Sequence, residues 1–533
     1  MKRSIVFLVL TSVLLSSCVG NTSLWGQYPT PTPIGWIPET STPAPDVFIP
    51  DTPIPTPINI VAPTASPTPT ALANFVPNEA ATQPSADIAP TIDGNSILYY
   101  AQSGDTLPAV ASRFGVDANE VTSPKILPET GLIDVDTLLI IPDSLDKAIS
   151  YTPSTRFIPD SDVVFSATAI DFDIEKYVKD AGGYLSNYRE YLGTTAWTSG
   201  PQEIKRLAYE NSINPRLILA LLDYEANWVR GKPESKFRTD YPMGHEDYHN
   251  LGMFGQMAWA VDQLSIGYYG WRKGSLTELV FNDGNRLRLD PTLNAGTVAV
   301  MTLFSRHHSL NEWLRIMDVN SGFPYFYQNM FGDPWARADT LNNLFPPGLA
   351  QPTMTLPFER GRTWAYTGGP HGAWEANGPL AAIDFAPEGD KPGCYTASSW
   401  VVAIVSGLVV RSENGVVVVD MDGDGSEQTG WNVMYLHIAN KDRVPLGQWV
   451  EQDGRIGHAS CEGGVSTGTH VHIARKYNGE WIIADGPIPF VLDGWRVVDG
   501  DKPYQGSLVR DGESIKADIY AQAWSLITRK DDE

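Results

Sequence analysis

Residues 466–476 read STGTHVHIARK, and this stretch decides how the C-terminal part of the chain folds. A Gly/Thr-rich turn leads into residues that fit the start of a β-strand. Side chains two residues apart on a strand point to the same face, so His470 and His472 should share one side. Neutral imidazole is a common metal ligand and a general base near neutral pH. The pair therefore predicts a metal site or an acid–base site, unless two polar side chains simply occupy a half-exposed strand.

Short apolar runs precede this strand and are separated by Gly, Asn and Asp. They read WVVAIVSGLVVR (400–411), GVVVVDM (415–421) and WNVMYLHI (431–438), which predicts an antiparallel β-sheet. The same part of the chain contains His371, Asp384 and His437 as further nitrogen and oxygen ligands. Three such ligands with an open fourth position are what a catalytic zinc ion requires.

These motifs resemble the lysostaphin-like or LytM-type zinc endopeptidases, which cut peptide bonds in bacterial walls. The similarity covers about residues 368–474 and includes YLH, the Gly-rich RIGHASCEGGVSTGTH and the final His-x-His. It implies an antiparallel β-sheet domain over 355–525. The site residues that it implies are the zinc ligands His371, Asp384 and His472, with His437 and His470 acting on the bound water and the oxyanion. The rival interpretation is a metal-free LytM domain that activates a partner amidase.

Composition and the first residues predict where the protein works. With 533 residues the chain should form several domains, and its net charge of -24 argues against nucleic acid, because phosphate binding needs a basic face. Residues 1–17 have a basic start and an apolar run too short to span a membrane, which predicts an export signal. LSSC, ending at Cys18, resembles a bacterial lipobox and implies a lipid anchor at the cell envelope; a stray cysteine after an ordinary signal is the alternative.

Two further features follow from composition. Residues 18–95 are rich in Pro and Thr, so they predict a disordered linker that tends toward polyproline II. Apart from Cys18 the chain contains only Cys394 and Cys461. An isolated pair in an exported protein predicts one disulfide, with two free buried thiols as the alternative.

The stretch ILYYAQSGDTLPAVASRFGV (97–116) predicts a strand, a turn and a helix, and LLIIP closes the unit as a second strand. The unit resembles the LysM module, a strand-helix-helix-strand fold that binds glycans containing N-acetylglucosamine. The similarity implies a βααβ module over 96–145 that binds peptidoglycan. The residues of its SGDTL motif that would contact the glycan are Gly104, Asp105, Thr106 and Leu107.

The stretch INPRLILALLDYEANWV (213–229) predicts a helix that Asn214 caps and Pro215 begins. Glu225 falls on the apolar face of this helix, where burial should raise its pKa, as a glycosidase acid requires. Pairing of Glu225 with a nearby arginine, or its rotation to solvent, is the alternative.

This region also resembles the lysozyme-like lytic transglycosylases. GMFGQM (252–257) and LDPTLNAG (289–296) match their patterns alongside the helix that carries Glu225. The similarity implies a mostly α-helical domain over 165–348, in which Glu225 would protonate the glycosidic oxygen.

Two motifs are weaker. HEDYH (245–249) has the His-Glu-x-x-His pattern of zinc proteases, but Pro and Gly before it and Asn and Gly after it predict a loop. DMDGDGSEQTG (420–430) places Asp420, Asp422 and Asp424 at calcium-loop spacing, but Trp431 occupies the twelfth position, so it is no EF-hand. A calcium-stabilised hairpin and a plain acidic turn both remain open.

Together these features predict a multidomain α+β protein that is exported and lipid-anchored. Its partners would be peptidoglycan and, through the lipid, a membrane. The predicted activity is zinc-dependent cleavage of wall peptides, with zinc as cofactor and calcium as a second candidate. The alternatives are a catalytically silent regulator of an amidase and an enzyme that chiefly cleaves glycan strands.

Overall fold

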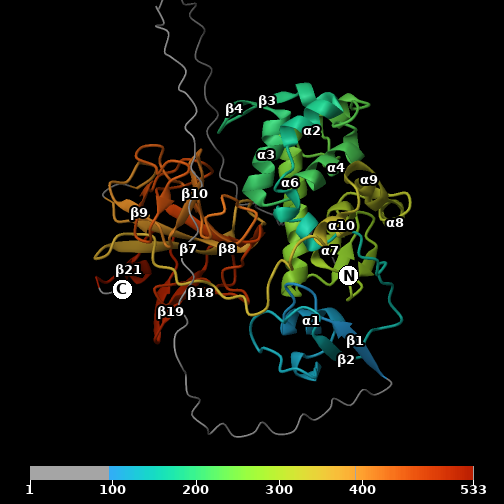
Figure 1. The fold of residues 1–533 in the computed structure, drawn as a ribbon, viewed down its shortest axis with the longest axis horizontal. Coiled ribbons are helices and arrows are strands. Elements are labelled where there is room, and N and C mark those ends of the chain that lie inside the picture. The colour runs from blue at the N-terminus through green and yellow to red at the C-terminus, as the bar shows by residue number, and fades with distance from the viewer. Residues whose placement is uncertain (1–94, 390–391, 532–533) are drawn as a thin grey trace, which may run out of the picture. The chain divides into compact units, whose positions relative to one another are not determined.

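The computed structural model describes residues 95–389 and 392–531. The predicted signal peptide, the lipidation site Cys18 and nearly all of the predicted linker lie outside the described residues. Within the described ranges, no helix is both long and apolar enough to cross a membrane. The chain combines helices with antiparallel sheets, as the sequence predicts, and Figure 1 shows the elements.

The first folded part is small. Strands β1 (Ser96–Tyr100) and β2 (Leu138–Pro142) pair antiparallel, and α1 (Leu107–Phe114) lies between them in the chain. The Thr106 side chain caps α1 by accepting a backbone hydrogen bond from its first turn. The second predicted helix is only a three-residue 3-10 turn, Ala118–Glu120.

Most of the helices lie in the middle of the chain. They are α2 (Ile174–Ala181), α3 (Gly200–Asn211), α4 (Pro215–Ala226), α5 (Lys236–Asp240), α6 (Gly252–Lys273), α7 (Ala295–Ser305), α8 (Leu310–Ile316), α9 (Phe323–Phe331) and α10 (Pro334–Ala338). Two hairpins interrupt them, β3 (Arg189–Leu192) with β4 (Ala196–Ser199) and β5 (Glu278–Val280) with β6 (Arg286–Arg288). Asn214 caps α4 and Pro215 begins it, so this prediction is confirmed.

Helices α6 and α7 pack closely because of one glycine. A Cβ atom at Gly267 would lie 2.8 Å from the Ala299 Cα and 2.7 Å from the Thr302 Oγ1. Any larger residue would therefore push the two helices apart. α7 ends at Ser305, and the chain then turns at His307 and His308.

The C-terminal part is built on an antiparallel sheet with the strand order β13-β10-β11-β12-β15-β8-β7-β21, and β16 also pairs with β15. Its strands are β7 (Thr363–Gly372), β8 (Leu380–Pro387), β10 (Gly407–Glu413), β11 (Val416–Asp420), β12 (Trp431–Leu436), β13 (Trp449–Val450), β15 (Val471–Tyr477), β16 (Glu480–Trp481) and β21 (Leu526–Thr528). Smaller sheets contain β9 (Trp400–Val402) with β14 (Arg455–His458), and β17 (Val491–Leu492), β18 (Trp495–Asp499), β19 (Gly506–Arg510) and β20 (Glu513–Lys516).

The large sheet is buried on both faces. Val417 and Val419 of β11 pack into a core made by the C-terminal region alone. Their neighbours Val416 and Val418 belong to a core that is shared with the helical region. Because strand side chains alternate between faces, the helices cover one face of this sheet and C-terminal segments cover the other.

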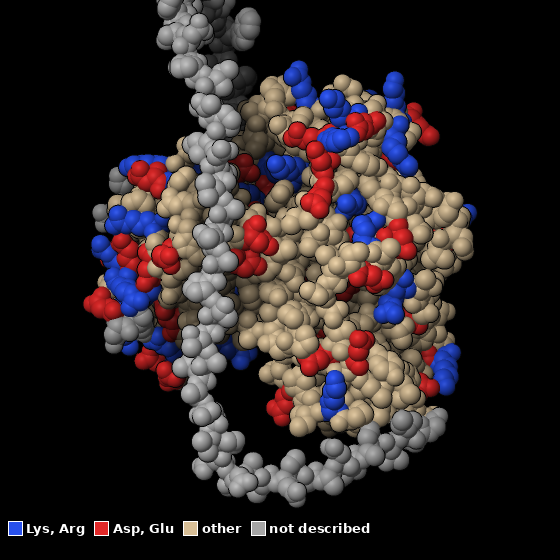
Figure 2. Space-filling view, in the orientation of Figure 1, with Lys and Arg blue, Asp and Glu red and all other residues tan. Residues whose placement is uncertain are grey.

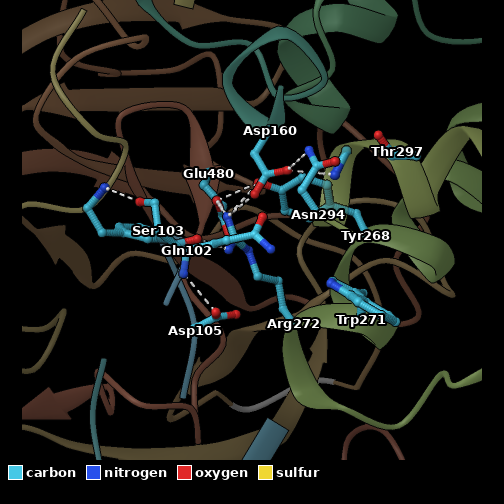
Figure 3. A network of polar contacts seen from close by, with 12 residues as sticks. Gln102, Ser103, Asp105, Asp160, Tyr268, Trp271, Arg272, Asn294, Thr297 and Glu480 are labelled. Atoms are coloured by element: carbon cyan, nitrogen blue, oxygen red, sulfur yellow. Dashed lines mark hydrogen bonds and ion pairs between the residues drawn. The ribbon is translucent and has the colours of Figure 1, made fainter. Parts of the chain in front are cut away.

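A buried polar network joins the helical region to the sheet (Figure 3). The Arg272 guanidinium, from α6, lies 3.0 Å from the carboxylates of both Glu480 and Asp160. The Tyr268 hydroxyl donates to Glu480 Oε2 at 2.7 Å. Only 8% of the Arg272 side chain is exposed. Sequence reasoning gave no indication of this network, since its members are far apart along the chain.

Cys394 and Cys461 form a disulfide, so the predicted pairing is confirmed. Their Cα atoms are 5.6 Å apart and 67 residues separate them in sequence. The bond joins the loop after β8 to the loop that leads into β15. Beside it, the Thr469 side chain bridges to the Tyr395 carbonyl at 2.7 Å, which further ties the two loops together.

Charged side chains of both signs are interspersed on the face seen in Figure 2. Over the whole sequence, 62 Asp and Glu residues outnumber 38 Lys and Arg residues. This distribution agrees with the expectation that the chain does not bind nucleic acid, which stays a prediction.

Candidate metal centre

Three neighbouring strands of the large sheet bring His371, Asp384 and His472 together. His472 on β15 is directly opposite Asp384 on β8 in the antiparallel register. His371 lies near the end of β7, the next strand over. All three side chains are buried, with residue exposures of 2%, 6% and 5%.

The three side chains point one potential ligand atom each at a common centre. His371 Nε2 lies 3.0 Å from His472 Nδ1. Asp384 Oδ1 lies 3.3 Å from each of these two nitrogens. Separations of this size are close to the edges of a tetrahedron around a zinc ion, whose bonds to nitrogen and oxygen are about 2.0–2.2 Å long.

Backbone carbonyls fix which nitrogen of each ring faces the centre. The His371 Nδ1 lies 2.8 Å from the Gly369 carbonyl, and the His472 Nε2 lies 3.0 Å from the Ala373 carbonyl. A carbonyl oxygen can only accept a hydrogen bond, so these outer nitrogens carry the protons. The inner nitrogens are then free to bind a metal, an arrangement found in most histidine metal sites.

The buried carboxylate also fits a metal ligand. Asp384 Oδ1 has no hydrogen-bond partner among the described residues, although it is buried. Burial raises the pKa of Asp384, but the neighbouring His371 and His470 outweigh this and hold the pKa well below its ordinary value. A carboxylate oxygen aimed at two ring nitrogens is a donor set that suits zinc.

His437 and His470 flank this cluster without belonging to it. Their ring centroids are 4.5 Å apart, and His470 Nε2 lies 3.7 Å from Asp384 Oδ1. The His437 Nδ1 donates to the Glu462 carbonyl at 2.9 Å, and the His470 Nδ1 donates to the Gly468 carbonyl at 2.8 Å. Both rings are therefore fixed in orientation, with Nε2 left available for chemistry.

Two features set the environment of His437. Burial, together with nearby His470 and His472, lowers the pKa of His437 to about 3. Its backbone has a φ of 65°, in the left-handed region that few residues other than glycine adopt. Such strained conformations cluster at functional sites, where the surrounding structure holds them in place.

Tyr504 is a neighbour of the cluster that sequence reasoning missed. Its ring stacks on His371 with the centroids 4.1 Å apart and the planes at 20°. The Tyr504 carbonyl accepts a hydrogen bond from the Gly369 amide at 2.9 Å. Tyr504 comes from the turn between β18 and β19, and no sequence motif around it indicates a contact with His371, which lies more than a hundred positions earlier.

The prediction that burial would raise the pKa of Glu225 is wrong. Burial does favour the neutral acid, but His307 and His308 outweigh it and lower the pKa to about 2. The Arg238 guanidinium also lies 3.3 Å from Glu225 Oε2. A lowered pKa of Glu225 does not match the raised pKa that a glycosidase acid requires. Sequence reasoning missed the two histidines because they follow α7, far from α4.

The predicted glycan-binding motif is partly buried in the protein itself. Asp105 is 1% exposed, accepts a hydrogen bond from the Tyr99 hydroxyl at 2.6 Å and pairs with Arg113 at 2.6 Å. It thus stabilises its own module and cannot contact a glycan, which corrects that assignment. Gly104 is buried beside Arg272, whereas Thr106 and Leu107 are partly exposed.

The two weaker motifs do not gain support as metal sites. HEDYH is a loop ending in a 3-10 turn, Tyr248–Asn250, as predicted. The carboxylates of Asp420, Asp422 and Asp424 lie close enough to share an ion, but each accepts hydrogen bonds from backbone amides of its own loop. An acidic turn explains this geometry without calcium.

Comparison with known proteins matches two parts of the chain. Residues 156–345 match the family described as LasA, N-terminal domain. The chain is 28% identical over 352 residues to Protease LasA of Pseudomonas aeruginosa, which covers 61% of this chain and 74% of that protein. It is 28% identical over 173 residues to the Beta-lytic metalloendopeptidase of Achromobacter lyticus, covering 31% of this chain and 42% of that protein.

Among solved structures, one described as the M23 metalloprotease Pseudoalterin from deep-sea is 24% identical. It covers 32% of this chain and 96% of its own, with a TM-score of 0.26. The sequence similarities support homology to Protease LasA and to the beta-lytic metalloendopeptidases. The family match covers most of the helical region, for which the sequence predicted a lysozyme-like domain; that resemblance stays a prediction.

Proposed function

We propose that the protein is a zinc-dependent endopeptidase that cleaves peptide bonds in bacterial peptidoglycan. The observation that carries this proposal is the convergence of His371 Nε2, Asp384 Oδ1 and His472 Nδ1 on one centre. These three residues would hold the metal. Zinc, when bound, supplies a Lewis acid that polarises a peptide carbonyl and acidifies water.

The remaining residues of the site would move protons and hold the substrate. His437 keeps its Nδ1 proton on the Glu462 carbonyl, so its Nε2 can accept a proton from the attacking water. In its doubly protonated form, His470 would donate a hydrogen bond from Nε2, on the side of Asp384, to the oxyanion that develops on the substrate. The strained backbone of His437 and the hydrogen bonds to both rings keep this pair in position before substrate arrives.

Peptidoglycan as the substrate is supported by the resemblance of the first folded part to LysM modules and by the name of the beta-lytic relatives. We also propose that the chain is exported and anchored through Cys18, since the first 18 residues carry the signal and lipobox pattern. The linker would then let the folded parts reach the wall from the membrane.

Incubation of the purified chain with peptidoglycan tests the proposal. Endopeptidase action frees amino groups, and mass spectrometry of the products identifies the bond that is cut. Loss of amino-group release on removal of zinc, and its return when zinc is added, are the expected results. A chain that holds zinc but releases only anhydro-sugar ends, the product of glycan cleavage, would contradict the proposal. A chain that binds no zinc would favour the alternative function, regulation of an amidase.

A further inference from the structure

A second cluster of metal-ligating side chains lies in the helical region, in a different part of the chain from the peptidase site. Glu225 stands at the C-terminal end of α4, and His307 and His308 follow the end of α7. We propose that these three residues bind a divalent transition metal ion of the zinc class. This site does not depend on the proposed peptidase function.

The geometry of the cluster suits a single ion. Glu225 Oε1 lies 3.3 Å from His308 Nε2 and 3.7 Å from His307 Nε2. One ligand atom from each of the three residues lies within 4.8 Å of the others. These separations are slightly longer than those between His371, Asp384 and His472, and small side-chain rotations would bring all three atoms to zinc-binding distance.

His307 provides an independent observation that points to a ligand. Both of its ring nitrogens are buried, yet neither has a hydrogen-bond partner among the described residues. Its ring lies against the aromatic side chains of Trp259 and Phe304, which offer no acceptor. An imidazole in such surroundings is costly to leave unsatisfied, and a metal ion at Nε2 would supply the missing partner.

The carboxylate is held as a metal ligand requires. Only 4% of the Glu225 side chain is exposed, and Arg238 contacts Oε2 at 3.3 Å while Oε1 faces the histidines. One oxygen is thus paired with a cation outside the cluster, and the other faces the two histidines of the cluster. Outer partners of this kind orient ligating carboxylates in many metal sites.

The donor set and exposure define the class of ion. Two imidazoles and one carboxylate favour zinc or a similar first-row metal, whereas calcium and magnesium prefer oxygen ligands throughout. The His308 side chain is 20% exposed, so an ion has a path from solvent. Three protein ligands would leave at least one coordination position for water or another molecule.

The simpler alternative is that the cluster is an ion pair between Glu225 and a protonated His308. Metal analysis of the full chain distinguishes the two. After equilibration with zinc and removal of the unbound metal, we expect about two zinc ions per wild-type chain. The His308→Ala variant should retain about one, and its affinity at the lost site should fall by roughly tenfold or more. Glu225→Gln keeps the shape of the side chain and should show the same loss.

Two further variants make the assignment specific. His249→Ala removes an exposed histidine of the neighbouring loop, which pairs with Asp247, and should leave both zinc ions in place. His472→Ala should lose only the zinc of the peptidase site. Circular dichroism checks that each variant is folded, and the partly exposed position of His308 makes that substitution a mild one.

The outcomes separate this inference from the proposed function. The wild-type chain could bind a single zinc ion that is lost in His472→Ala and retained in His308→Ala. This result would overturn the second site alone. A single zinc ion that is lost in His308→Ala and retained in His472→Ala would overturn the peptidase metal site and support the second site. Cobalt in place of zinc gives a second readout, because each occupied site adds its own visible absorption band.

Discussion

His470 and His472 are two residues apart on one strand face, yet their ring nitrogens have different surroundings. If His472 is a zinc ligand, His472→Ala should lower bound zinc and activity together. His470→Ala leaves the ligand set intact, so zinc should stay near one ion at this site while turnover falls by about 10²–10⁴-fold. Metal analysis beside cleavage of a peptidoglycan-derived peptide measures both quantities.

The same assay distinguishes the zinc ligands from the acid–base residues among the other side chains of the site. His437→Ala should behave like His470→Ala, whereas His371→Ala and Asp384→Ala should behave like His472→Ala. Full zinc content in His371→Ala would show that another residue supplies the third ligand. Equal loss of zinc in His470→Ala would remove the distinction between the two histidines.

Tyr504 should position His371 through the stacking of the two rings. Tyr504→Ala removes this support, and we expect the zinc affinity of the peptidase site to fall by roughly tenfold, as for loss of other outer contacts. Tyr504→Phe keeps the ring and should bind zinc as wild type does. Competition with a chromogenic chelator measures the affinity, and an unchanged value in Tyr504→Ala would show that the stacking contributes nothing.

Sequence reasoning at this scale succeeded where a local rule applied. The two-residue period of a strand predicted that His470 and His472 face one site, and the structure places them so. The same reasoning failed for Glu225, because His307 and His308, which lower its pKa, come from the turn after a distant helix, α7. Tyr504 could not be found at all, since stacking between distant residues leaves no local pattern.

Among the elements, α6 and β16 are joined by the buried pair of Arg272 and Glu480. Glu480→Ala leaves the buried guanidinium with Asp160 as its remaining carboxylate partner. We expect the free energy of unfolding to fall by roughly 3 kcal/mol, the lower end of the range for breaking a buried pair. Denaturant unfolding followed by tryptophan fluorescence measures this change.

An exposed pair provides the control. Arg286 and Glu278 are 63% and 41% exposed, and Glu278→Ala should change the free energy of unfolding by at most about 1 kcal/mol. Similar effects in the two variants would mean that the α6–β16 network is not a specific stabilising contact.

The elements themselves were easier to predict than their contacts. Asn214 and Pro215 mark the start of α4 by local chemistry, and the valine-rich runs predicted the central strands. These runs do not indicate that one face of the sheet packs on helices. β11 is apolar at every position that faces either core, so its two faces look alike in sequence. The contacts of Glu480 with α6 likewise depend on the assembled fold.

At the scale of the whole molecule, pH should affect the contact between the helices and the sheet. Burial, together with the nearby carboxylates Asp262 of α6 and Glu210 of α3, raises the pKa of Glu375 to about 7, while Arg206 opposes the shift. The folded state therefore binds this proton more tightly than the unfolded state. Its contribution to stability is complete below pH 4.5 and is lost as the pH rises through about 7.

The variant Glu375→Gln imitates the protonated side chain and isolates this effect. Between about pH 5 and about pH 8, the thermal midpoint of wild type should fall more than that of Glu375→Gln. Glu278→Gln, which changes an exposed carboxylate, should follow wild type. Parallel pH profiles of wild type and Glu375→Gln would show that Glu375 does not titrate in this range.

The predicted mixture of helices and antiparallel sheets is confirmed, but sequence patterns did not indicate how tightly the helices pack on the sheet. The shared core of α-helices and β11 and the network around Arg272 join regions that motif matching treats as separate modules. Packing of this kind depends on the shape of whole surfaces, which no short motif records.

The pairing of β21 with β7 has a consequence for the order in which the protein is made. Leu526–Thr528 pair with the first three residues of β7, 363–365, so during synthesis this part of the edge stays unpaired until the ribosome has passed residue 528. The last ligand strand, β15, also emerges late. His371, Asp384 and His472 should therefore come together only after β15 has left the ribosome, so the candidate metal centre cannot form on a shorter nascent chain.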